Sequence, residues 1–294
     1  FLLNRSSDLA YSVKLFYASP SSMDNALFKW CHVRGRFRND DMQYDVFNGD
    51  ADGICSLIQL RRQMPLVSTR ITGVKRDIAL LESVSGIAGD CVTVLDISML
   101  TNHLALSRLL DKGVSIDYID HHASGVIPDH HLLTHTISEA PEMCTSLLVN
   151  ARLRGAEVDW AITGSFGDNL HESAIKIAKK TMMSESYVAY LKKLGTLVNY
   201  NAYGLNLEDL HYHPEILYRK LYEAESPKGF RDSEDFHALC QGYEADLAAS
   251  AQIAPEIDLS NLAIFQLPSL PWARRVIGVF SNHLVRDYPN RAHA

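Results

Sequence analysis

Short apolar runs alternate with longer amphipathic segments from residue 44 onward. Glycine, asparagine or aspartate bounds most of the short runs, which is typical of strands that end in turns. The predicted strands cover residues 44–47, 70–75, 91–97, 114–119 and 160–163. Helices are expected at about 54–63, 102–112 and 143–154. Strands separated by helices of this length predict an α/β fold, with a mostly parallel sheet and helices on both of its faces.

The pattern changes on either side of this region. Residues 1–41 follow neither the strand period nor the helix period, so we expect an extension that is not part of the domain. Residues 169–252 predict a mainly helical region. Its expected breaks lie near Gly195, Asn201–Gly204, Pro214 and Pro227–Gly229. A proline-containing connector at 255–271 precedes a strand-like pattern over 272–285.

Composition narrows the classes of partner. The net charge of -7 gives no basic surface for long duplex nucleic acid or for an anionic membrane. No run approaches the roughly 18 apolar residues of a membrane span. The five cysteines contain no Cys-x-x-Cys pair, which argues against a zinc knuckle or a disulfide framework and favours a reduced, cytoplasmic compartment. A phosphate substrate stays compatible with the acidic charge, because bound divalent metals supply positive charge locally.

Carboxylates and imidazoles follow the predicted strands. Asp50 and Asp52 lie in the loop after the first strand, and Asp96 ends the third. Asp120-His121-His122 ends the fourth strand, and Asp168 lies in a glycine-rich turn after the fifth. Any one of these turns also fits a simple helix cap. Because the carboxyl ends of parallel strands meet at one edge, the whole set predicts a site for a hard divalent cation.

This ordered set of motifs resembles the DHH phosphoesterase superfamily over about residues 44–175. That superfamily includes RecJ-type exonucleases, nanoRNases, cyclic-dinucleotide phosphodiesterases and family II inorganic pyrophosphatases. The resemblance implies two divalent cations, with Mn preferred and Mg as the alternative. By this resemblance Asp50 and Asp52 bind different cations, and Asp96 bridges both. His121 and Asp168 complete one shell, and His122 contacts the substrate phosphate or the leaving group, with Asp120 beside it in the catalytic pair.

Two positions depart from the family pattern. Val46 stands where many members have a histidine, and Asn48 stands where RecJ-like loops carry a further aspartate. Asn48 is an additional candidate ligand, but its neutral carbonyl oxygen is weaker than a carboxylate. We therefore expect one of the two cation sites to be looser than the other.

Further candidates stand outside the main set. A second triplet, Asp129-His130-His131, follows Pro128, and proline is a poor occupant of a central strand. We expect this copy in the connection after the motif strand, with a place at the substrate entrance as the lesser alternative. His171 and Arg76 are candidate substrate-binding residues, and a solvated surface role is the alternative for each. Lys75 directly precedes Arg76 and has the same two alternatives.

The expected activity is metal-dependent hydrolysis of short oligonucleotides or linear dinucleotides similar to pGpG, with a homodimer as a candidate assembly. A pyrophosphatase or exopolyphosphatase, and a non-catalytic nucleotide-binding protein with a degenerate site, are the alternatives. The resemblance also implies a domain plan. It consists of an extension at 1–41, a catalytic core at 42–180, a helical region and connector at 181–265, and the start of a truncated DHH-associated substrate domain at 266–294.

Overall fold

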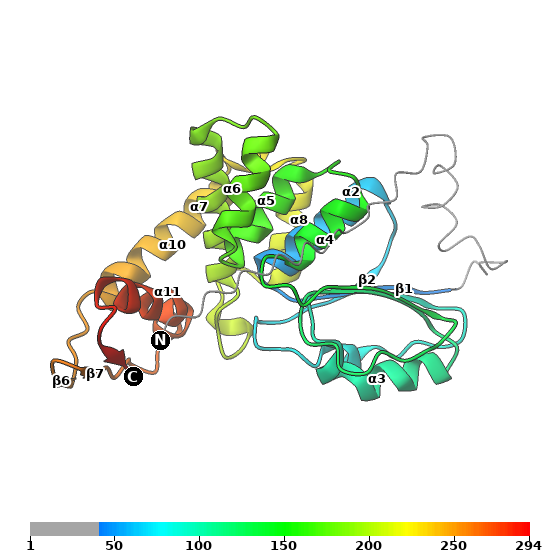
Figure 1. Ribbon diagram of the computed structural model, residues 1–294, viewed down its shortest axis with the longest axis horizontal. Coiled ribbons are helices and arrows are strands. Elements are labelled where there is room, and N and C mark those ends of the chain that lie inside the picture. The colour runs from blue at the N-terminus through cyan, green and yellow to red at the C-terminus, as the bar shows by residue number, and fades with distance from the viewer. Residues whose placement is uncertain (1–40) are drawn as a thin grey trace, which may run out of the picture. The chain divides into compact units, whose positions relative to one another are not determined.

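The computed structural model describes residues 41–294 (Figure 1). The predicted extension at 1–41 therefore lies, except for its last residue, outside the described residues. A central sheet contains five parallel strands in the order β2-β1-β3-β4-β5. Their bounds are Gln43–Phe47 for β1, Thr69–Ile71 for β2, Cys91–Leu95 for β3, Ser115–Asp120 for β4 and Leu133–Ile137 for β5. The predicted α/β class with a parallel sheet is confirmed.

The first four strands lie where the apolar runs predict them, although β2 ends before Lys75. The fifth prediction is wrong, because residues 160–163 belong to helix α5, Val158–Gly167. This segment is fully buried, and a short apolar run does not distinguish a buried strand from a buried helix. The fifth strand is instead β5, whose side chains are only partly buried at the edge of the sheet.

Consecutive residues of the central strands face opposite layers of the core, as the pleat requires. One layer packs against α3, Met99–Asp111, and the short 3-10 helix η2, Leu80–Ser83, and the other packs against α2, Ala51–Gln63. Buried strand residues on the α3 side include Val46, Val94 and Tyr118. Their neighbours Phe47, Leu95 and Ile119 are buried on the α2 side. Figure 1 shows α3 on one face of the sheet and α2 on the other, which confirms the predicted helices on both faces.

A group of helices extends the layer that contains α2. It comprises α4 Thr145–Arg152, α5, α6 His171–Lys180, α7 Glu185–Asn201, the 3-10 helix η3 Leu207–Asp209, α8 Pro214–Glu223, α9 Pro227–Phe230 and α10 Glu234–Ser250. The mainly helical character of this region is confirmed, but the predicted break at Gly195 is wrong. Gly195 lies inside α7, where a Cβ atom would stand 2.2 Å from the carbonyl oxygen of Thr163 in α5. The glycine allows two helices to approach closely and does not end one.

The C-terminal segment contains a small sheet and one long helix. The strands are β6 Ile257–Asp258, β7 Leu262–Ile264 and β8 Ala292–His293, in the order β6-β7-β8. The strand-like pattern predicted over 272–285 is wrong, because this segment is α11, Pro271–Asp287. Proline in the first turn of a helix is favourable, and only one stripe of α11 is buried. The predicted domain boundaries at 180 and 265 stay predictions.

The buried guanidinium of Arg275 joins α11 to the helical layer. It donates hydrogen bonds to the Asp246 carboxylate of α10, at 2.8 Å and 3.2 Å, and to the phenol oxygen of Tyr200 in α7, at 3.2 Å. Charge-assisted bonds of this kind are among the stronger polar contacts in a protein.

None of the helices over residues 41–294 combines the length and the apolar character that a membrane span requires.

A buried polar row connects the sheet to the helices above it. Asp45, Thr93 and Asp117 are register neighbours on β1, β3 and β4. Arg61 of α2 pairs with Asp45 and donates to the Thr93 hydroxyl at 3.0 Å, and Arg152 of α4 pairs with Asp117 at 2.6 Å. These ion pairs fix α2 and α4 over the strands whose ends carry the candidate site residues.

Replacement of Arg61 by alanine tests this anchoring. The side chains of Arg61 and Asp45 are only 7% and 1% exposed, so the variant removes the ion-pair partner of a buried carboxylate. We expect a loss of about 3 kcal/mol or more in the free energy of unfolding, measured by urea denaturation. The matched control is Arg286→Ala, which breaks an exposed pair with Asp287 and should change stability by less than about 0.5 kcal/mol. Equal losses in the two variants would contradict the assignment.

Candidate metal centre

The loop after β1 has a shape fixed by two side chains. The Asp50 carboxylate caps α2, because its Oδ1 accepts from the N–H groups of Asp52 at 3.0 Å and Gly53 at 3.1 Å. Asn48 accepts from the N–H of Asp50 at 3.1 Å and donates through Nδ2 to the carbonyl of Lys75 at 3.2 Å. Asn48, the additional candidate ligand, thus holds the loop against the segment after β2.

Asp52 joins the start of α2 to the start of α4. Its two carboxylate oxygens accept from the N–H groups of Thr145 and Ser146, both at 2.7 Å. These amides belong to the first turn of α4, whose own N-cap residue, Cys144, provides no side-chain cap. The N-terminal end of a helix favours negative charge nearby, and the remaining lone pairs of Asp52 stay available to a cation.

Asp96 follows β3 with a strained backbone. Its φ of 60° lies in the left-handed region, which residues other than glycine rarely adopt. The side chain is 2% exposed and accepts from the Thr145 hydroxyl at 3.1 Å. Burial raises the pKa of this carboxyl well above its ordinary value, and the nearby carboxylates of Asp52 and Asp50 raise it further. Strain and charge repulsion at one residue are typical of a functional position.

The end of β4 presents a carboxylate and an imidazole as a unit. Asp120 is fully buried, and its Oδ1 accepts from Nδ1 of His122 at 2.8 Å. This bond raises the pKa of His122 above its ordinary value, against the opposing effect of burial. Oδ2 of Asp120 has no hydrogen-bond partner among the described residues. The His122 ring is 45% exposed, so Asp120 orients a solvent-accessible imidazole.

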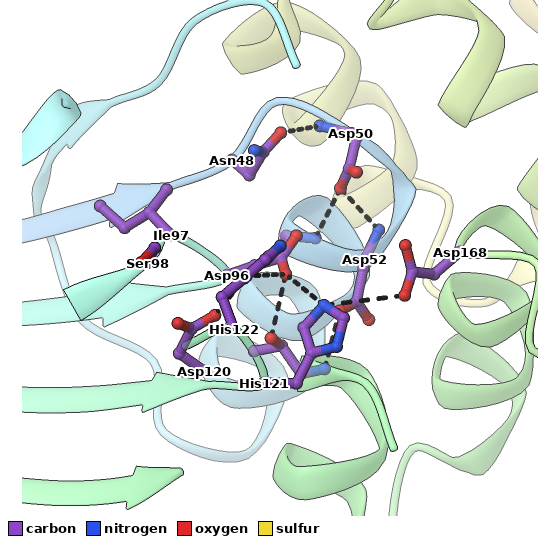
Figure 2. A network of polar contacts seen from close by, with 12 residues as sticks. Asn48, Asp50, Asp52, Asp96, Ile97, Ser98, Asp120, His121, His122 and Asp168 are labelled. Carbon is purple, nitrogen blue, oxygen red and sulfur yellow. Dashed lines mark hydrogen bonds and ion pairs between the residues drawn. The ribbon is translucent and has the colours of Figure 1, made fainter. Parts of the chain in front are cut away.

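His121 lies among three carboxylates (Figure 2). Its Nε2 is 3.4 Å from Asp96 Oδ1, 3.7 Å from Asp168 Oδ2 and 3.9 Å from Asp52 Oδ2. Two sets of potential ligand atoms result, each with its members within 4.8 Å of one another. They are Asp96, His121 and His122, and Asp52, His121 and Asp168. Carboxylate oxygens with one or two imidazoles are a donor set that suits Mn²⁺ or Mg²⁺.

Asp168 reaches this cluster from a helix end. The prediction of a strand-to-helix turn is wrong, since Asp168 is the C-cap of α5. A Cβ atom on Gly167 would lie 2.3 Å from the Cβ of Ala51, so α5 ends directly against the start of α2. Burial raises the pKa of Asp168 to about 7, with added repulsion from Asp52 and Asp50. The side chain is thus held near other carboxylates at a cost that a cation would remove.

Lys75 is the polar residue that sequence reasoning underestimated. Its Nζ lies 2.5 Å from Asp50 Oδ2, 3.1 Å from Asn199 Oδ1 and 4.0 Å from Asp168 Oδ1. Burial alone would raise the pKa of Asp50, but the ammonium lowers it to about 2. Arg76, the candidate from the same pair, is exposed. Lys75 follows β2 closely, and this position is the feature of the sequence that could have identified it as a site residue. The sequence alone does not show that β2 lies beside β1.

Two other histidine candidates belong to neither set of potential ligand atoms in the described part of the chain. His171 is the first residue of α6, and its ring packs against Phe166 with centroids 5.7 Å apart. Burial and the charge of Lys192 lower its pKa. The second triplet, Asp129-His130-His131, directly precedes β5, which runs parallel to β4. It therefore lies toward the amino ends of the strands, at the opposite edge of the sheet from the first triplet.

The strand order explains why the first group of residues meets. After β1 the chain crosses through α2 to β2 on one side, and after β3 it crosses through α3 to β4 on the other side. The two connections leave the sheet in opposite directions and open a crevice at the carboxyl ends of β1 and β3. Asp50 and Asp52 border this crevice from β1, and Asp96 borders it from β3. The triplet at the end of β4 lies one strand farther along.

The raised pKa of Asp168 predicts a pH dependence for the metal-free protein. Between pH 4 and about 7, the folded chain holds a proton on this carboxyl that the unfolded chain has released. The free energy of unfolding should therefore fall as pH rises through this window. Asp168→Asn should reduce the slope, measured by urea denaturation in EDTA. The exposed Asp287→Asn serves as control and should keep it. A slope unchanged by Asp168→Asn would contradict the assignment.

Comparison of the sequence with known protein families finds no match, and no curated protein matches it. Several solved structures resemble the fold, two of them with TM-scores above 0.5. Exonuclease RecJ bound to manganese is 16% identical, with 87% of this chain and 77% of that chain covered, at a TM-score of 0.55. The DHH domain of a protein from a family of ribosomal proteins is 15% identical, with coverage of 84% and 69%, at a TM-score of 0.52. The described chain thus shares its fold with an exonuclease RecJ and with a DHH domain.

Proposed function

We propose that this protein is a metal-dependent phosphoesterase that hydrolyses phosphodiester bonds in short oligonucleotides or linear dinucleotides. One observation carries the proposal. Asp52, Asp96, His121 and Asp168 converge at the carboxyl edge of the parallel sheet, beside the exposed imidazole of His122. The fold supports this proposal, because the similar exonuclease RecJ was solved with manganese bound.

The donor set fits a divalent cation. Asp96 and Asp52 are buried among like charges, and Oδ2 of Asp120 lacks a hydrogen-bond partner within the described part of the chain. Burial of an unpaired carboxylate is costly, and a bound cation would offset that cost. The ligands at its centre would be His121, Asp52, Asp96 and Asp168. Manganese is our preferred cation and magnesium the alternative, since both accept carboxylate and imidazole ligands.

A bound divalent cation lowers the pKa of a water molecule and stabilises charge on the phosphoryl oxygens. The protein side chains have separate tasks. Asp120 accepts from Nδ1 of His122 and so leaves Nε2 of this partly exposed ring for the substrate. The raised pKa of His122 keeps the imidazole protonated at higher pH than usual, so that Nε2 can donate a proton to the leaving oxygen. Asp96 and Asp52 would supply carboxylate oxygens to the cation beside His121.

The proposed substrates are short. A net charge of -7 disfavours long polyanions, because the protein as a whole repels each added phosphate charge. A dinucleotide places only its scissile phosphate and the groups next to it near the centre.

Pyrophosphate and polyphosphate are the substrates that test the pyrophosphatase and exopolyphosphatase alternatives. Nucleotide binding without turnover would fit the alternative of a non-catalytic protein with a degenerate site.

Replacement of His121 by alanine is the sharpest test of the activity. The wild-type protein with Mn²⁺ is incubated with an RNA dinucleotide, pGpG, cyclic dinucleotides, pyrophosphate and polyphosphate. We expect release of mononucleotides from the linear dinucleotides. His121→Ala should lower kcat/KM by more than the roughly 10–100-fold typical when a group that only supports a metal ligand is lost.

The second triplet provides a matched control. His131→Ala removes an exposed histidine from the same motif at the other edge of the sheet and should leave turnover unchanged. Activity retained in His121→Ala, or lost equally in both variants, would contradict the site. Hydrolysis of pyrophosphate alone would favour the pyrophosphatase alternative.

A further inference from the structure

The carboxylate of Asp50 is already engaged at both of its oxygens. Oδ1 accepts two backbone N–H groups at the start of α2, and Oδ2 lies 2.5 Å from Nζ of Lys75. Asp50 belongs to neither set of potential ligand atoms around His121. A carboxylate paired with an ammonium at this distance already has its counter-ion.

Val46 and Asn48 provide no further metal ligand beside Asp50. Val46 is fully buried in the apolar layer that packs against α3. The Asn48 amide is used on both sides, by the N–H of Asp50 and by the carbonyl of Lys75. The polar groups beside Asp50 therefore stabilise the loop and the lysine.

Several contacts hold Lys75 in this position. Its N–H donates to the Ala202 carbonyl at 2.9 Å, and Nζ donates to Oδ1 of Asn199 at 3.1 Å, both at the C-terminal end of α7. The ring of Tyr203 lies 5.7 Å from Nζ, within the range of a cation–π contact. The ammonium is thus fixed between the β1 loop and α7.

The other donors gather around His121. Asp52, Asp96 and Asp168 approach Nε2 of His121 at 3.9 Å, 3.4 Å and 3.7 Å. Asp168 borders both groups, with its Oδ1 4.0 Å from Nζ of Lys75 and its Oδ2 3.7 Å from Nε2 of His121. A second divalent ion at Asp50 would meet the ammonium directly, and like charges at such short range repel strongly.

We propose that Lys75 takes the place of one of the two divalent cations, so that the centre holds one divalent ion at Asp52, Asp96, His121 and Asp168 and one fixed ammonium at Asp50. The inference rests on the proposed function, because it concerns the same metal-dependent centre. It replaces the looser cation site expected from Asn48 with a side chain of the protein. A fixed ammonium at this edge can also pair with a phosphate oxygen of the substrate.

The number of ions bound per chain tests this inference without an activity assay. The full chain is freed of metal with EDTA, titrated with Mn²⁺ by calorimetry, and analysed for bound manganese after gel filtration in the presence of excess Mn²⁺. We expect one ion per chain, with the electron paramagnetic resonance spectrum of an isolated Mn²⁺. Two ions per chain, with a spin-coupled spectrum, would overturn the inference and leave the proposed function intact. Absence of binding would overturn both.

Two variants test the role of Lys75 directly. Lys75→Met removes the ammonium but keeps the length of the side chain, so Asp50 loses its counter-ion and a second Mn²⁺ should bind. Lys193→Met is the matched control at a half-exposed lysine near Glu244, and it should still bind one ion. A single ion in Lys75→Met would show that the lysine does not replace a cation.

A conservative pair of aspartate variants decides the question if Lys75→Met does not fold. Asn also caps helices well, so Asp50→Asn preserves the start of α2. This variant should still bind one Mn²⁺ with its dissociation constant changed by less than about 10-fold, whereas Asp52→Asn should weaken binding beyond that limit. An Asp50→Asn variant that loses manganese as Asp52→Asn does would identify Asp50 as a ligand and overturn the inference.

Discussion

Burial of several carboxylates at one edge of the sheet is the constraint that organises this protein. Each of them must find positive charge or hydrogen-bond donors, since an uncompensated buried anion is costly. Asp52 uses the N-terminus of α4, Asp50 uses the backbone of α2 and the Lys75 ammonium, and Asp120 uses the imidazole of His122. The arrangement of α2, α4 and the segment after β2 follows from these needs.

Apolar packing and buried ion pairs hold the framework that makes this arrangement possible. Alternating strand residues fill one layer against α3 and another against α2, and the Arg61–Asp45 pair fixes α2 over the sheet. The close approach of α5 at Gly167 brings Asp168 toward the start of α2. Stability supplied by the core thus offsets the strain at Asp96 and the repulsion among the carboxylates.

Some of the site could be predicted because the responsible signals are local. A strand followed by Asp-Ala-Asp-Gly or Asp-His-His places its side chains at a strand end, and ends of parallel strands share an edge. The role of α5 was mistaken because its buried apolar run has no helical period to detect. Lys75 and Arg76 carry the same two alternatives in sequence because adjacent basic residues look alike, and only the path of the chain after β2 separates the exposed Arg76 from the Lys75 that pairs with Asp50.

The α/β class, four of the five strands in the central sheet, and the group of aspartates and histidines follow from local patterns, because periodicity and turn residues act over short distances. Which of these residues meet depends on the folded chain. It placed the second triplet at the opposite edge, brought Asp168 in from a helix end and positioned Lys75 against Asp50. Those outcomes depend on strand order and helix packing between residues far apart in the chain, which no local pattern encodes.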